Sequence, residues 1–157
     1  MHLLPLPVLA AEDEESDAFI LRLAFQKAGV SNPLVIVSDG HEAIDYLASH
    51  GRYSDRNAHP LPALLLLDLK MPRMSGFDVL RWLSMQPNFQ HLPAIVLSSS
   101  SDESDLLRAR QLGARDYFVK PLSLPDFVGI IKSLQSRWLT DRIVAEPHAV
   151  PPVRPRA

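Results

Sequence analysis

The stretch that most constrains the fold runs from Leu64 to Leu67, four consecutive leucines followed directly by Asp68. An unbroken apolar run of this length is typical of a strand buried on both faces of a parallel sheet, and it is far too short to cross a membrane. Residues 69–76 then supply the proline and glycine of a turn. Ligands of open α/β sheets bind at the carboxyl ends of the strands, so Asp68 is either a simple strand terminus or a candidate for chemistry.

Strand and helix patterns alternate along the rest of the chain. The predicted strands cover residues 6–11, 33–38, 64–67, 93–97 and 116–119. Four of the predicted helices cover residues 17–29, 75–85, 102–112 and 124–139, and a further one follows Asp39-Gly40 and carries the apolar residues Ala43, Ile44, Leu47 and Ala48. Five strands that alternate with five helices predict a parallel sheet with helices on both faces and right-handed crossovers.

Composition excludes several classes of protein. The 157 residues suffice for one domain that buries about two thirds of its unfolded surface. The absence of cysteine excludes a disulfide scaffold, a thiolate zinc site and a cysteine nucleophile, and it fits a cytoplasmic location. A net charge of −2 gives no footprint for nucleic acid, and no segment has the length of a membrane helix. We therefore expect neither nucleic acid nor a membrane as a partner.

Polar side chains leave four of the five predicted strands where each strand ends. Glu12 and Asp13 follow the first strand, Asp68 follows the third, Ser98 the fourth and Lys120 the fifth. Because the carboxyl ends of parallel strands share one edge of the sheet, we expect these five side chains to converge. Two carboxylates about 5 Å apart repel by roughly 3 kcal/mol at an effective dielectric constant near 20, so protons or a cation must neutralise the cluster.

The donor set favours a magnesium ion over zinc. Mg²⁺ prefers carboxylate oxygens and water, whereas zinc prefers cysteine and histidine, and none of the six histidines has ligand spacing. Lys120 adds a point charge and Ser98 a hydroxyl donor, both suited to the oxygens of a phosphoryl group.

Each of these residues also has a simpler explanation. Glu12 and Asp13 open an acidic run that suits the start of a solvated helix, and Glu14, Glu15 and Asp17 are assigned to that helix start. Only the convergence of several residues at one edge favours a site.

The residues together resemble the receiver domain of two-component response regulators over about residues 6–140. The resemblance is carried by Glu12-Asp13, by Asp68 with its Met71-Pro72 and Ser75-Gly76 turn, by Ser98, and by Tyr117 to Pro121. The connection at residues 50–62 and the ending at residues 131–139 further resemble the stand-alone regulators that partner bacterial phytochromes. The resemblance implies a flavodoxin-like, doubly wound sheet with strand order 2-1-3-4-5.

Roles for single residues follow from the resemblance alone. It implies that Asp68 accepts a phosphoryl group from a sensor histidine kinase. Asp13 and Asp68 would hold Mg²⁺ with the backbone carbonyl of Lys70, and Glu12 would act through a metal-bound water. Lys120 and Ser98 would contact the phosphoryl group. Tyr117 would change rotamer when the domain switches.

Three rival functions share parts of this pattern. A flavodoxin-like cofactor binder requires a phosphate-binding loop after the first strand, where this chain has carboxylates. A phosphatase with an aspartate nucleophile requires a second aspartate at the position of Lys70. A degenerate receiver that only docks would lack the complete set of residues.

The expected output is a protein signal rather than turnover of a substrate. Residues 1–140 are predicted to form the receiver domain, and the proline-rich residues 141–157 are predicted to be a disordered tail. Such a protein is not an enzyme except toward its own phosphorylation and dephosphorylation. We expect the signal to pass through the fourth helix, the fifth strand and the fifth helix, and a homodimer to form through that last helix and Trp138.

Overall fold

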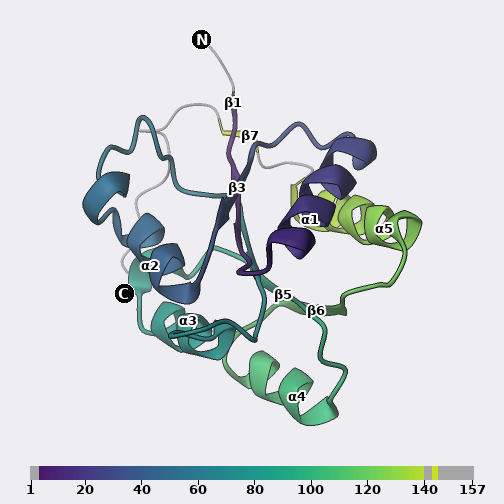
Figure 1. Cartoon of the computed structure of the whole chain (residues 1–157). Helices are drawn as coiled ribbons and strands as arrows, with labels where there is room; N and C mark the ends of the chain where they lie inside the picture. The colour runs from purple at the N-terminus through teal and green to yellow at the C-terminus, as the bar shows by residue number, and fades with distance from the viewer. Residues whose placement is uncertain (1–3, 140–142, 145–157) are drawn as a thin grey trace.

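The computed structural model describes residues 4–139 and 143–144, and its centre is one parallel sheet (Figure 1). The strands of this sheet are β2 (Val8–Ala11), β3 (Leu34–Val37), β4 (Leu64–Leu67), β5 (Ala94–Ser98) and β6 (Asp116–Val119). They lie in the order β3-β2-β4-β5-β6, with every neighbouring pair parallel. When these five strands alone are numbered along the chain, with β2 as the first and β6 as the fifth, their order is 2-1-3-4-5. The predicted doubly wound fold is therefore confirmed.

Five α-helices lie between the strands in sequence, and they cover the two faces of the sheet (Figure 1). They are α1 (Glu15–Ala28), α2 (Gly40–Ala48), α3 (Gly76–Ser84), α4 (Glu103–Gln111) and α5 (Leu124–Leu134). α1 and α5 contribute to one hydrophobic core, and α2, α3 and α4 contribute to the other. The sheet is therefore buried from both sides, as its apolar strands require.

The four leucines of β4 show how the sequence pattern produces this arrangement. Leu65 and Leu67 belong to the core beneath α2 and α3, whereas Leu64 and Leu66 belong to the core beneath α1 and α5. Side chains alternate along a strand, so a central strand with two covered faces must be apolar at every position. Asp68 is the first residue beyond this constraint.

The first strand of the large sheet starts later than predicted. The prediction begins at Leu6, but β2 begins at Val8 because Pro7 has no N–H to donate to a neighbouring strand. The carbonyl of Pro7 still accepts a hydrogen bond from the Ala63 N–H at 2.8 Å.

The two ends of the described chain form a separate small sheet. β1 (Leu4–Pro5) pairs with β7 (Ile143–Val144) in an antiparallel ladder. β7 lies within residues 141–157, for which the sequence predicted a disordered tail. The rest of that segment lies outside the described residues.

The last predicted helix changes its winding before it ends. Regular α-helix stops at Leu134, and residues Gln135–Leu139 continue as a π-helix. One-turn 3₁₀-helices occupy Gly51–Tyr53 and Pro87–Phe89. Of the helices in the described part of the chain, none combines the length and the apolar character that crossing a bilayer needs.

Candidate functional site

The carboxyl ends of the strands bring the predicted residues to one edge of the sheet. Ala11, the last residue of β2, lies opposite Leu67, the last residue of β4, so Glu12 and Asp68 leave the sheet side by side. The Asp68 N–H donates to the Ala11 carbonyl at 3.2 Å. The Lys120 N–H donates to the Ser98 carbonyl at 2.7 Å, which joins the ends of β5 and β6.

Lys120 is the cation at the centre of this edge. Its Nζ lies 2.6 Å from Glu12 Oε1, 2.8 Å from Asp17 Oδ2 and 2.9 Å from Asp68 Oδ2. The side chains of Lys120, Glu12 and Asp68 are nearly buried, with exposed fractions of 11%, 6% and 9%. Lys120 therefore contacts Asp68 directly, at the edge where the strand ends converge.

Burial and pairing act in opposite directions on these charges. Burial raises the pKa of Glu12, and the hydrogen bond from Lys120 reverses this only in part, so the pKa stays above its ordinary value. For Lys120, burial alone favours the neutral amine. The hydrogen bonds to Asp17, Glu12 and Asp68 outweigh burial and raise the pKa of Lys120, which keeps the ammonium charged.

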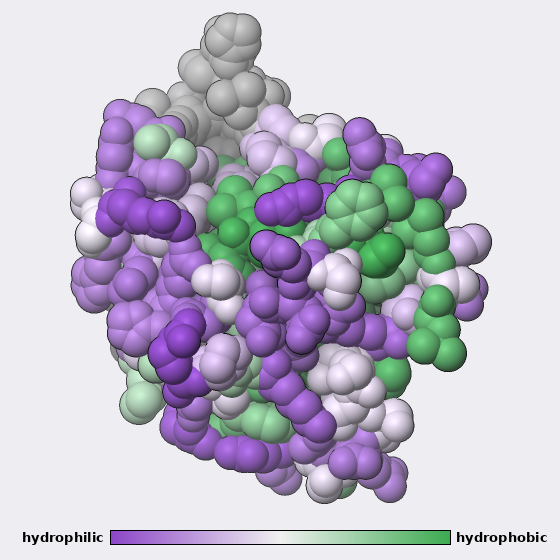
Figure 2. All heavy atoms as spheres, in the orientation of Figure 1, coloured by the Kyte–Doolittle hydropathy of each residue, from purple (hydrophilic) through white to green (hydrophobic). Residues whose placement is uncertain are grey.

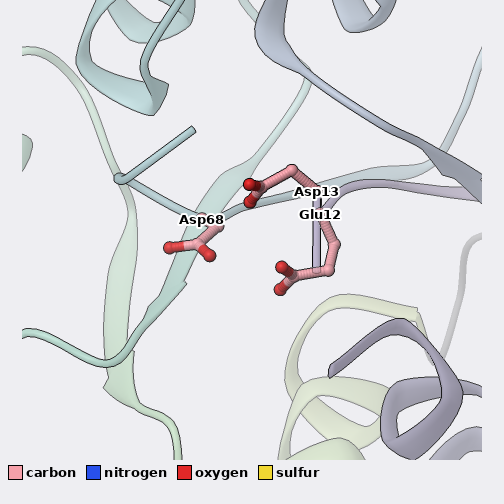
Figure 3. Close-up of side chains that lie close together, drawn as sticks. All are labelled: Glu12, Asp13 and Asp68. Carbon is pink, nitrogen blue, oxygen red and sulfur yellow. The ribbon is translucent and has the colours of Figure 1, made fainter. Parts of the chain in front are cut away.

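Three carboxylates at this edge have the geometry of a cation site. Glu12, Asp13 and Asp68 each offer one oxygen, and the three oxygens lie within 4.8 Å of one another (Figure 3). Asp13 is exposed, whereas Glu12 and Asp68 are buried. Oxygen ligands of this kind fit a hard divalent cation such as Mg²⁺ or Mn²⁺, and the exposed Asp13 leaves one side open to water.

The loop after β4 holds the backbone of Asp68 against the start of α3. The Gly76 N–H donates to the Leu69 carbonyl at 3.0 Å, and a Cβ on Gly76 would lie 2.4 Å from the Asp68 carbonyl oxygen. Only glycine allows this close approach. The Lys70 N–H donates to Asp68 Oδ1 at 3.3 Å, while the Lys70 side chain points to solvent.

Ser98 ends β5 opposite Val119 of β6, and Tyr117 lies two residues before Val119. Ser98 is fully buried, and its Oγ accepts a hydrogen bond from the Ser100 N–H at 3.2 Å. The Tyr117 hydroxyl donates to the Ser100 carbonyl at 2.8 Å. Between Ser98 and Asp68, both within the described residues, there is no hydrogen bond. Tyr117 is thus attached to the loop that leaves Ser98.

Sequence reasoning missed one residue of the site itself. Asp17, in the first turn of α1, was assigned to a solvated helix start, but its carboxylate is a direct partner of Lys120. The acidic run explains Asp17 without any contact, so the sequence carries no signal that separates it from Glu15.

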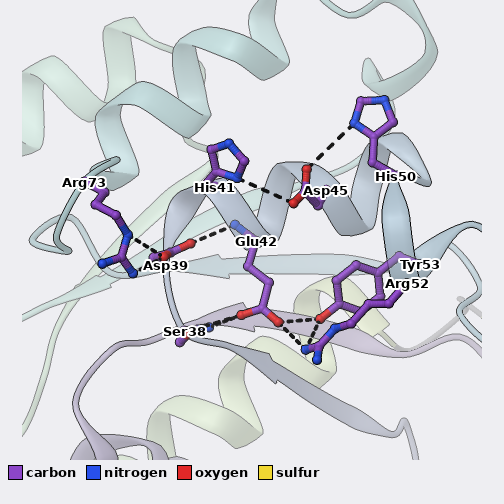
Figure 4. A network of polar contacts seen from close by, with 9 residues as sticks. All are labelled: Ser38, Asp39, His41, Glu42, Asp45, His50, Arg52, Tyr53 and Arg73. Atoms are coloured by element: carbon purple, nitrogen blue, oxygen red, sulfur yellow. Dashed lines mark hydrogen bonds and ion pairs between the residues drawn. The ribbon is translucent and has the colours of Figure 1, made fainter.

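A second polar cluster, here called the α2 network, was also missed; its members are Ser38, Asp39, Glu42, Arg52, Tyr53 and Arg73 (Figure 4). Asp39 caps α2 by accepting the Glu42 N–H at 2.8 Å, and its other oxygen pairs with the Arg73 guanidinium. Arg73 lies in the loop after Asp68 with a φ of 65°. The α2 network therefore fastens that loop to the start of α2.

Comparisons with known proteins agree with this geometry. The family described as response regulator receiver domain matches residues 8–132. Response regulator Rcp1 of Synechocystis is 29% identical over 86% of this chain and 90% of its own length. The Mn²⁺-bound form of Rcp1 is also similar in structure, with a TM-score of 0.77, 27% identity and coverage of 90% of this chain and 100% of that one.

Two further solved structures are similar to nearly the whole described fold. Response regulator RPA3017, from red light signaling of R. palustris, has a TM-score of 0.82 and 39% identity, and the match covers 90% of this chain and 99% of that one. The phosphorylated cyanobacterial phytochrome response regulator RcpA has a TM-score of 0.80 and 29% identity, with the same two coverages. This chain therefore belongs to the response regulator receiver domain family, and within it resembles phytochrome response regulators.

Proposed function

We propose that this protein accepts a phosphoryl group on Asp68 from a sensor histidine kinase in a Mg²⁺-dependent reaction. The observation that carries the proposal is the position of the Asp68 carboxylate at the buried end of β4, 2.9 Å from Lys120 Nζ and beside the carboxylates of Glu12 and Asp13. Family membership and the likeness to a phosphorylated regulator support it.

Glu12, Asp13 and Asp68 are proposed to hold the metal ion, with the backbone carbonyl of Lys70 as a further ligand. Glu12 is proposed to act through a metal-bound water, since its Oε1 already accepts from Lys120. Mg²⁺, when bound, would neutralise the carboxylates and orient the phosphoryl oxygens.

The side chains of the chain itself would position the transfer. An oxygen of Asp68 attacks the phosphorus of a phosphohistidine, an O–P bond forms, the P–N bond breaks, and the imidazole nitrogen leaves with the electron pair. Lys120 and Ser98 are proposed to contact the transferred oxygens. Phosphoryl transfer needs such positioning and charge neutralisation more than further covalent chemistry, so the protein needs no enzymatic activity toward other substrates.

The signal is proposed to leave through the face formed by α4, β6 and α5. Tyr117 connects β6 to the loop before α4, so movement at Ser98 would reach this face through that contact. Leu107 on α4 and Val119 on β6 are large apolar side chains with exposed fractions of 54% and 44%. In this proposal, a protein partner would cover these two side chains.

The cellular setting is also part of the proposal. We place the protein in the cytoplasm, which fits the absence of cysteine. We place its kinase among the bacterial phytochromes, on the likeness to a cyanobacterial phytochrome response regulator and to a regulator of red light signaling. We further propose that the protein forms a homodimer through α5 and the π-helix, with Trp138 in the interface. Equal sedimentation of the wild type and Trp138→Ala across a dilution series would remove the dimer from the proposal.

Intact-mass measurement after incubation with acetyl phosphate and Mg²⁺ tests the chemistry. We expect one added phosphoryl group that is lost with a chelator and in Asp68→Asn. Asp45→Asn, which removes a carboxylate from α2 outside the site, is the matched control and should be labelled normally. Labelling that survives in Asp68→Asn, or no labelling of the wild type by acetyl phosphate or by a kinase, would contradict the proposal.

A further inference from the structure

The Lys120 ammonium is shared among three carboxylates, and one of them lies outside the cation site. Glu12 and Asp68 belong to the three residues with converging oxygens, but Asp17 does not. Asp17 reaches Lys120 from the first turn of α1 at 2.8 Å, a distance between those of the other two contacts. The contact therefore joins α1 directly to the residue that follows β6.

All three donors of the ammonium are used in this arrangement. A lysine ammonium carries three N–H groups, and each of the three carboxylates accepts one. No N–H is left for an incoming phosphoryl oxygen. Lys120 must therefore weaken one of its contacts before it can bind a phosphoryl group at Asp68.

Burial indicates which contact is the weakest. The carboxylates of Glu12 and Asp68 are nearly buried, so losing Lys120 would leave an uncompensated charge out of water. The Asp17 side chain has an exposed fraction of 42%, so water can replace the ammonium there at little cost. Asp17 is therefore the partner that Lys120 can leave.

We infer that Asp17 is a positioning residue that restrains Lys120 in the unphosphorylated site and releases it to the phosphoryl group. The inference rests on the proposed function of Asp68. It assigns to the start of α1 a part in setting the rate of phosphorylation: the pair between α1 and Lys120 must open as the phosphoryl group arrives.

The sequence offers a matched control for this role. Glu15 lies in the same first turn of α1 and is exposed, and no contact joins it to Lys120 within the described chain. Asp17→Asn and Glu15→Gln both replace a carboxylate by an amide of similar size. They change the net charge equally, and only Asp17→Asn replaces a charged hydrogen-bond partner of Lys120 by a neutral one.

The rate of phosphorylation by acetyl phosphate is the first measurement. We expect Asp17→Asn to raise this rate by about two- to fivefold, the range of a half-exposed ion pair. The increase should persist in 1 M salt, where the Debye length is about 3 Å. Glu15→Gln should change the rate less, and salt should remove its effect. Asp17→Glu, which keeps a carboxylate in reach, should restore a rate near that of the wild type.

The nitrogen NMR signal of the Lys120 ammonium, in metal-free unphosphorylated protein, is the second measurement. We expect its protons to exchange faster with water in Asp17→Asn but not in Glu15→Gln. A rate in Asp17→Asn that falls, or that equals the rate in Glu15→Gln, overturns the inference, as does an unchanged NMR signal. If the wild type is not phosphorylated at all, the proposed function has failed, and the NMR comparison still decides whether Asp17 restrains Lys120.

Discussion

Two clusters of charged side chains lie close to each other and are built in opposite ways. At the sheet edge that carries Asp68, the carboxylates of Glu12, Asp17 and Asp68 share Lys120. Asp13 adds a further negative charge beside Glu12 and Asp68 (Figure 3). In the α2 network, each of the two carboxylates has its own guanidinium: Glu42 pairs with Arg52 and Asp39 with Arg73 (Figure 4).

The pKa directions of three carboxyls in these clusters follow the same division. Burial raises the pKa of Glu12 above its ordinary value. Burial acts in the same direction on Asp39 and Glu42, but hydrogen bonds from backbone N–H groups and neighbouring side chains outweigh it and lower both pKa values. In the α2 network each carboxylate has a guanidinium partner. At the edge of the sheet, in contrast, the single ammonium of Lys120 faces more carboxylates than it can neutralise. Uncompensated charge of this kind is what the proposed binding of a cation and a phosphoryl group at this edge would neutralise.

The largest expected effect comes from Gly76, which allows the start of α3 to pack against the backbone of Asp68. In Gly76→Ala, the new Cβ meets the Asp68 carbonyl at 2.4 Å, so backbone must move, and we expect a loss of about 3 kcal/mol in the free energy of unfolding. Urea denaturation measures it. Gly129→Ala on α5 is the control: nothing lies within 4 Å of its Cβ, so we expect a gain of up to about 1 kcal/mol. Equal effects of the two variants would contradict the close approach.

Asp39→Ala should break the α2 network. The variant loses the cap of α2 and the pair with Arg73, and we expect it to cost about 2 kcal/mol in the free energy of unfolding. Asp39→Asn keeps a capping oxygen and should cost less. If Asp39→Ala is no less stable than the wild type, the contacts of Asp39 with Arg73 and with the start of α2 do not stabilise the fold.

Glu42→Gln should give an effect of about 1 kcal/mol that depends on pH. Because the folded-state pKa of Glu42 lies below its unfolded value of about 4.3, its stabilisation is present above that pH and is lost as the pH falls through the folded pKa. The difference in unfolding free energy between the wild type and Glu42→Gln should therefore shrink between neutral and acid pH. A difference that stays constant or grows over this range contradicts the prediction.

The smallest expected effect has the opposite sign. Asp13→Ala removes one exposed negative charge from the crowded edge, and we expect it to stabilise the metal-free protein by about 0.5 kcal/mol. With Mg²⁺ in excess the wild type should become the more stable of the two proteins, because an ion bound to the native state stabilises the wild type more than the variant. Thermal unfolding with a chelator and with Mg²⁺ measures both. A destabilised Asp13→Ala in chelator would show that the edge is not repulsive.

Much of this arrangement could be predicted from the sequence because strand ends converge. The leucines of β4 predicted a central strand, and the parallel sheet then placed Glu12, Asp68 and Lys120 together without any knowledge of side-chain contacts. The first strand began two residues late because a proline does not donate to a ladder.

Contacts between helices and loops could not be predicted in the same way. Asp17 is one of several acidic residues near the start of α1, and only the path of the chain after β6 selects it as a partner of Lys120. Arg73 reaches Asp39 because its backbone adopts a left-handed conformation, which the side-chain pattern does not encode. Such contacts depend on the path of each loop after its strand, and the spacing of apolar residues along the chain contains no information about that path.

The pairing of β1 with β7 has a consequence for how the chain assembles. Leu4 lies opposite Val144, so this small ladder closes a loop that contains all five strands of the large sheet. Closing so long a loop is entropically unfavourable until the segments between its ends have folded. We therefore expect β1 and β7 to meet last during folding and to separate first under mild denaturant, which makes the β1–β7 ladder an indicator that the rest of the domain is complete.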